Sequence, residues 1–167
     1  IGSFDPESGE CATKTAEVFS DAFGEQLTEL ANEDPRICAI TAAMPGGTGL
    51  LQFKKVHSER LFDVGIAEAH ALTFSAGLCA RGLRPYTVIY STFLQRAYDN
   101  IIHDVVLQNL PVVFCLDRGG LVGEDGATHH GIFDIAYMGC LPNLIVATPS
   151  DERELRNMMF TALQSGT

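Results

Sequence analysis

The chain has 167 residues, of which 46% are hydrophobic, and its formal net charge is −10. This length and apolar content suit one domain with a sizeable buried core. The acidic charge argues against nonspecific binding to nucleic acid or to an anionic membrane, and no apolar stretch reaches the roughly 18 to 20 residues that cross a bilayer. We therefore expect neither a nucleic-acid nor a membrane partner.

The cysteine pattern and the chain ends bear on location. None of the five cysteines forms a C-x-x-C pair, which is typical of a chain in a reducing compartment. The N-terminal residues lack the basic and apolar regions of a signal peptide. We expect a cytoplasmic protein, or a plastid one if the chain comes from a plant-type precursor, and we interpret both ends as those of a fragment.

The first twelve residues differ from the rest. Residues 1–12 show no apolar period and contain two glycines, two serines and a proline, which predicts a linker or arm. Residues 13–167 are predicted to form one domain. Its first helix starts near Thr15, where apolar residues recur at helical spacing as far as Leu30, and Pro35 follows its end.

Strands and helices are predicted to alternate through the domain. Apolar runs, several of them rich in β-branched residues, predict five buried strands at 37–42, 61–64, 86–90, 112–116 and 144–147. Helices are predicted at 67–81, 93–108, 133–138 and 150–164, the last with Ser150 as its N-cap. The alternation predicts an α/β fold, a parallel β-sheet flanked by helices on both faces.

Polar residues suited to chemistry follow the predicted strands. Because parallel strands end at a common edge where ligands bind, we expect Glu68, residues 90–96 and residues 118–129 to meet there. The loop 117–131 is glycine-rich but matches neither the Walker sequence nor G-x-G-x-x-G. It is predicted to be a binding loop of another kind.

Structural roles are the alternatives for the charged residues. Glu68 alone would serve equally well as the acidic partner of a helix dipole. Arg96 and Arg118 offer two guanidinium groups to a phosphate or carboxylate, unless each pairs with an acidic neighbour such as Asp99 or Asp117.

The aromatic and histidine residues near this edge allow two roles each. His129 and His130 point in opposite directions in extended chain, so they are poor joint ligands and we expect no metal site. Near Asp125, His129 is suited to bond a substrate oxygen or to move a proton. Phe93 is a core residue unless the polar cluster beside it makes it a stacking surface.

Five motifs in order carry a family resemblance. They are ITAAMP at 40–45, DVGIAEAH at 63–70, YSTFLQRAY at 90–98, DRGGLVG at 117–123 and DGATHHG at 125–131. Together they resemble the 1-deoxy-D-xylulose 5-phosphate synthase family of thiamine-diphosphate enzymes, relatives of transketolase. The similarity runs from about Thr13 to Leu163 and concerns the pyrimidine-binding domain, which implies the thiamine-diphosphate-binding fold.

The resemblance implies thiamine diphosphate as cofactor and two residues that contact it. Glu68 would hydrogen-bond the N1′ nitrogen of the aminopyrimidine and favour the imino tautomer, which takes the proton from the thiazolium carbon. Glu68 is then an activator of the cofactor rather than the base itself. Phe93 would stack on the aminopyrimidine ring.

The resemblance also implies a reaction, the decarboxylative condensation of pyruvate with glyceraldehyde 3-phosphate. This is the family's first step toward isoprenoids, and its product also feeds thiamine synthesis. The substrate pocket would be lined by Tyr90, Arg96, Arg118, Asp125 and His129. The arginines suit the aldehyde's phosphate, Asp125 and His129 suit its oxygens, and His129 would be catalytic together with Glu68.

Part of the family's cofactor site is missing from this sequence. The Gly-Asp-Gly and Asn residues that hold the diphosphate through Mg²⁺ in this superfamily belong to a preceding domain, and a C-terminal domain is also absent. The resemblance implies a homodimer in which other domains of the enzyme complete the cleft. We therefore expect the isolated chain to be inactive and to bind cofactor poorly.

Two alternatives stay open. The first is the pyrimidine domain of another thiamine-diphosphate enzyme, a transketolase or the β subunit of a 2-oxo acid dehydrogenase, because both share the glutamate and the fold. The second is a non-enzymatic dimerisation module. The motifs at 90–96 and 125–130 favour the synthase over the first alternative, and the intact Glu68, Phe93 and His129 argue against the second.

Overall fold

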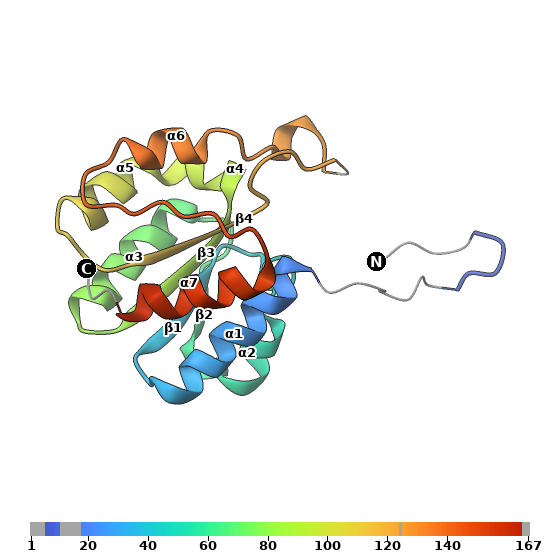
Figure 1. The fold of residues 1–167 in the computed structure, drawn as a ribbon, viewed down its shortest axis with the longest axis horizontal. Helices are drawn as coiled ribbons and strands as arrows, with labels where there is room; N and C mark the ends of the chain where they lie inside the picture. The colour runs from blue at the N-terminus through green and yellow to red at the C-terminus, as the bar shows by residue number, and fades with distance from the viewer. Residues whose placement is uncertain (1–5, 11–17, 124, 165–167) are drawn as a thin grey trace.

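One parallel sheet organises the chain. The structure, a computed structural model, describes residues 6–10, 18–123 and 125–164. Its four strands are all parallel in the order β2-β1-β3-β4 (Figure 1). Their bounds are β1 Ile37–Thr41, β2 Leu61–Asp63, β3 Arg84–Tyr90 and β4 Val113–Asp117. Of the predicted linker only residues 6–10 are described, and the expected helix start at 15–17 lies outside the described residues.

Helices cover both faces of the sheet, as predicted. One face carries α1 (Phe19–Glu33), α2 (Leu51–Val56) and α7 (Glu152–Gln164), and the other carries α3 (Glu68–Ala80), α4 (Ser91–Leu94) and α6 (Asp134–Gly139) (Figure 1). Side chains alternate along β1, so that Ile37 and Ala39 join one core cluster while Cys38 and Ile40 join the other. Burial on both sides explains the continuous apolar strand sequences.

The fifth predicted strand is wrong. Residues 144–147 belong to no strand of the described chain, and Ile145 is 82% exposed. A β-branched run favours extended backbone, but a strand also needs a hydrogen-bonded neighbour. Here the chain passes from α6 to α7 without one (Figure 1), so β4 is an edge strand of the described sheet.

The predicted helix 93–108 is divided. It begins directly after β3 as α4 and continues as a 3-10 turn, η2 (Gln95–Ala97), a short helix, α5 (Tyr98–Asn100), and a π-helical stretch, η3 (Ile101–Val106). Two further 3-10 turns are η1 (Ser58–Arg60) and η4 (Ala127–His129). None of the helices in the described ranges has both the length and the apolar character needed to cross a membrane.

The cap of α7 differs from the prediction. The amide of Glu154 donates to Asp151 Oδ1 at 2.7 Å, so Asp151 rather than Ser150 caps the helix. Ser150 instead donates its N–H and O–H to the Glu154 carboxylate, each at 2.7 Å. An aspartate one position nearer the helix competes successfully for the same role.

Candidate functional site

The carboxyl ends of the strands meet at one edge, and the backbone there is unusual. Ala43, after β1, has φ 62°, and Arg118, after β4, has φ 58°. Left-handed conformations cost non-glycine residues of order 1–3 kcal/mol and cluster at functional sites. Asp63 Oδ1 accepts hydrogen bonds from the amides of Ala43 and Gly65 at 2.8 and 3.1 Å, and Asp117 Oδ1 accepts from the Arg118 amide at 2.7 Å.

Glu68 lies at this edge as the first residue of α3. Its side chain is 6% exposed, and its Oε1 accepts a hydrogen bond from Arg96 Nη1 at 2.9 Å. The helix N-terminus favours an acidic residue, but a buried carboxylate also needs a counter-charge. Within the described chain Oε2 has no hydrogen-bond donor, so one carboxylate oxygen remains open to a ligand N–H.

Phe93 is at the centre of an aromatic group. Its ring lies parallel to that of Tyr90, with centroids 5.8 Å apart and 4° between planes, and His129 meets it edge-on at 5.3 Å. The Arg96 guanidinium carbon lies over the same ring, 5.2 Å from its centroid. Phe93 is partly buried and packs against the core cluster on this face, so the core and stacking interpretations both describe it.

Arg118 extends this group on the other side of Tyr90. Its guanidinium carbon lies 5.4 Å from the Tyr90 ring centroid, and its Nε is 3.5 Å from Asp125 Oδ2. Burial alone would lower the pKa of Arg118, but the hydrogen bond with Tyr90 and the charges of Asp117 and Asp125 outweigh it and raise that pKa. Arg118 is therefore a fixed positive charge at the strand edge.

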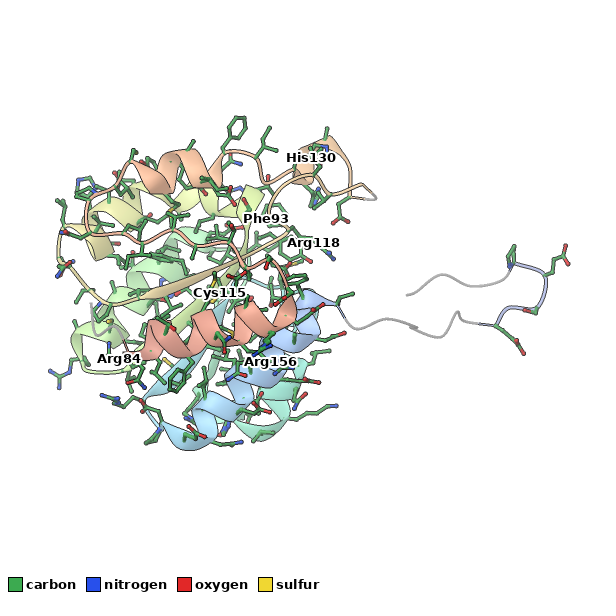
Figure 2. The ribbon with its side chains drawn as sticks, in the orientation of Figure 1. Arg84, Phe93, Cys115, Arg118, His130 and Arg156 are labelled. Atoms are coloured by element: carbon green, nitrogen blue, oxygen red, sulfur yellow. The ribbon has the colours of Figure 1, made fainter. Side chains whose placement is uncertain are left out.

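The glycine-rich loop is closed by hydrogen bonds between its own residues. Gly120 and Gly131 exchange two backbone hydrogen bonds, of 2.8 and 2.9 Å. The Val122 amide donates to His130 Nδ1 at 3.1 Å, so His130 supports the loop from within. Phe93, Arg118 and His130 lie toward the same end of the molecule (Figure 2).

Side-chain bonds tie the rest of the loop to α4. Thr92 Oγ1 donates to the Thr128 carbonyl at 3.0 Å, and Ser91 Oγ donates to Asp134 at 2.8 Å. His129 Nδ1 contacts Thr128 Oγ1 at 2.9 Å, which leaves His129 Nε2 without a partner among the described residues. These bonds hold His129 beside Phe93.

The structure brings all seven predicted site residues into one chain of contacts. The order of contact is Glu68, Arg96, Phe93, Tyr90, Arg118 and Asp125, with His129 joined at Phe93. Both arginines are paired with an acid, as the structural alternative expected, and Arg118 pairs with Asp125 rather than with Asp117. Arg96 pairs with Glu68 rather than Asp99, whose carboxylate lies 3.0 Å from His103 Nδ1.

Sequence reasoning missed residues that support the site without lining it. Asp63 joins the loops that follow β1 and β2, and Asp134 fixes the end of the glycine-rich loop on Ser91. Asp63 lies in the motif at 63–70, and nothing else in the sequence indicated that it supports the site. Gly47 lies in a different loop, the one that follows β1, and a Cβ there would collide with the Tyr90 hydroxyl.

The donor set fits an aminopyrimidine better than a metal. A buried carboxylate with one open oxygen suits a ring N–H, and an aromatic side chain within the same contact chain suits a planar ring. Among the described residues there is no group of three or more His, Cys, Asp or Glu side chains arranged to hold a metal ion.

Comparison with known proteins agrees with this geometry. Residues 17–167 match the family described as the transketolase pyrimidine-binding domain. The chain is 56% identical over 163 residues to a 1-deoxy-D-xylulose-5-phosphate synthase of Acidobacterium capsulatum, and 62% identical over 152 residues to one of Thermomicrobium roseum. The two alignments cover 98% and 91% of this chain but only 26% and 24% of those proteins. The chain therefore spans about a quarter of their length.

Solved structures agree on the fold. A split-gene transketolase described as an inactive β4 tetramer superposes with a TM-score of 0.80 at 30% identity, covering 91% of this chain and 49% of that one. Transketolase from Leishmania mexicana gives a TM-score of 0.80 at 23% identity, covering 92% of this chain and 24% of that one. The chain therefore belongs to the transketolase pyrimidine-binding domain family.

Proposed function

We propose that this chain is the pyrimidine-binding domain of a 1-deoxy-D-xylulose-5-phosphate synthase, which condenses pyruvate with glyceraldehyde 3-phosphate and releases carbon dioxide. Relatives of that name share 54% to 62% identity with it. The observation that carries the proposal is the buried Glu68 carboxylate, with one open oxygen, in a contact chain that runs through Arg118 to Asp125.

Each side chain has a task in this reaction. When bound, thiamine diphosphate supplies a nucleophilic thiazolium carbon. Glu68 orients the aminopyrimidine and holds a proton shared with its ring nitrogen, and Phe93 gives the ring an apolar surface. These two residues form the cofactor half of the site.

The remaining residues suit the aldehyde substrate. Arg118 offers a forked cation to the phosphate, and Asp125 can accept a hydroxyl proton. His129 can bond the substrate carbonyl or move a proton through Nε2, and Tyr90 supports both Phe93 and Arg118.

Other parts of the enzyme complete the site in this proposal. Mg²⁺ and the diphosphate would be held by another domain, and the working enzyme would be a cytoplasmic homodimer. Because the chain spans about a quarter of its curated relatives, we expect the isolated chain to be inactive and to bind thiamine diphosphate weakly. Rapid turnover of pyruvate by the isolated chain would contradict this.

Transketolase is the second candidate, since a split-gene transketolase shares 30% identity with the chain and its fold. The choice of donor separates the two. The full-length parent protein is incubated with thiamine diphosphate, Mg²⁺ and glyceraldehyde 3-phosphate, with either pyruvate or a ketose phosphate as donor. We expect a deoxyxylulose phosphate and carbon dioxide from pyruvate only. Transfer from the ketose phosphate without carbon dioxide would support transketolase instead.

A further inference from the structure

We propose that Arg96 is a positioning residue that holds Glu68 and Phe93 for the cofactor and takes no part in binding the substrate's anionic group, which the proposed function assigns to Arg118. The inference rests on the proposed function and revises one expectation from the sequence, because the family resemblance implies that both arginines line the substrate pocket. It follows from how the two guanidinium groups are partnered.

The contacts of the two arginines divide the site. Arg96 donates to Glu68 at 2.9 Å and lies over Phe93, so it contacts both residues expected to meet the aminopyrimidine. Arg118 lies over Tyr90 and faces Asp125, both expected to meet the substrate. Each guanidinium therefore belongs to a different half of the site.

The cost of separating each ion pair points the same way. Glu68 is 6% exposed, so removing Arg96 would leave a buried carboxylate without its counter-charge, which is strongly unfavourable. Arg118 and Asp125 are 43% and 41% exposed and 3.5 Å apart, so water can solvate both when they separate. The Arg96 side chain is itself 57% exposed, but a phosphate could draw it from Glu68 only at the cost of leaving that buried carboxylate unpaired. Arg118 can leave Asp125 at little cost.

The backbone that carries Arg96 is fixed by packing. Arg96 lies in η2 between Leu94, which is 1% exposed, and Ala97, which is completely buried. Its guanidinium is joined to the first residue of α3, so the pair links two rigid elements. Held in this way, Glu68 keeps Oε1 on Arg96 and presents Oε2 to the ligand.

The test compares Arg96→Gln, Arg96→Lys and Arg118→Gln in the full-length parent protein. Thiamine diphosphate with Mg²⁺ is titrated into each variant, and near-ultraviolet circular dichroism follows the bound aminopyrimidine. The KM for glyceraldehyde 3-phosphate is measured at saturating cofactor. We expect Arg96→Gln to weaken cofactor binding about tenfold or more and to change the dichroism, with a KM within about twofold of wild type.

The two other variants are expected to behave differently from Arg96→Gln. Arg118→Gln is expected to raise the KM about tenfold or more while leaving cofactor affinity unchanged. Arg96→Lys should recover part of the cofactor affinity, because lysine keeps the positive charge but lacks the planar guanidinium. If Arg96→Gln does not fold, Arg96→Lys is compared with wild type instead. The proposal is wrong if Arg96→Gln raises only the KM, or if it binds cofactor more tightly, which would mean that the guanidinium occupies the pyrimidine position.

A failure of this inference is distinct from a failure of the proposed function. If wild-type parent protein makes no deoxyxylulose phosphate, the function is wrong. If wild type makes the product but Arg96→Gln and Arg118→Gln have the same effects, the function stands and the division of the arginines is wrong.

Discussion

Among single residues, Tyr90 connects the two halves of the site. Its ring stacks on Phe93 and lies under the Arg118 guanidinium, and the residue is only 5% exposed. Its hydroxyl packs against Gly47, in the loop that follows β1. The position of one buried ring therefore sets the spacing between the residues proposed to meet the cofactor and those proposed to meet the substrate.

The packing of Gly47 gives a prediction. In Gly47→Ala the new Cβ would collide with the Tyr90 hydroxyl, so the ring must shift and carry Arg118 with it. We expect a loss of kcat/KM for the aldehyde of about tenfold or more in the full-length parent, because small displacements of positioned groups are costly. Gly46→Ala is the matched control, since its Cβ would meet only Leu51 at 3.9 Å. Equal kinetics in the two variants would refute the packing argument.

Buried thiols give a prediction for alkaline pH. Cys38 is 2% exposed, and burial raises the pKa of its thiol from 9.0 to about 11. A folded-state pKa above the unfolded value stabilises the fold fully below pH 9, and this contribution, up to about 3 kcal/mol, is lost as pH rises toward 11. Urea unfolding from pH 8 to 10.5 should therefore show a smaller fall in stability for Cys38→Ala than for wild type. An equal fall in stability in the two proteins would contradict this.

Among the secondary-structure elements, the predictions were confirmed where apolar residues recur with the period of a strand or a helix and are also buried in the structure. Apolar runs and parallel topology predict the positions of β1 to β4, the helices on both faces, and the meeting of Glu68, Phe93 and Arg118 at one edge. The run 144–147 has strand composition but no neighbour to pair with. The Glu68 to Arg96 ion pair joins residues 28 positions apart, so no local sequence pattern could predict this partner.

Close packing between elements gives the next prediction. In α1, a Cβ on Gly24 would collide with the backbone carbonyl of Gly49, and backbone cannot move aside as a flexible side chain can. Gly24→Ala should therefore destabilise the chain by about 1–3 kcal/mol. Gly77→Ala in α3 is the control, because nothing lies within 4 Å of its Cβ and alanine should stabilise a helix interior by up to about 1 kcal/mol. Urea unfolding of both variants tests the contrast, and a neutral Gly24→Ala would contradict it.

For the whole molecule, exposed apolar residues lie at the same edge of the sheet as the site. Glu68 and Arg118 face the carboxyl end of the sheet, while Ile66 and Leu121 beside them are 82% and 81% exposed. Exposed apolar residues around a polar cluster are typical of an interaction surface. This agrees with a chain that spans about a quarter of its curated relatives.

The most direct measurement is the release of carbon dioxide from pyruvate by the full-length parent protein, with thiamine diphosphate, Mg²⁺ and glyceraldehyde 3-phosphate. Wild type is compared with Glu68→Ala and with Glu29→Gln, which changes an exposed acid on α1. We expect aldehyde-dependent release that falls about a hundredfold or more in Glu68→Ala and is unchanged in Glu29→Gln. Wild-type rates in Glu68→Ala would contradict the role of Glu68 as the activator of the cofactor.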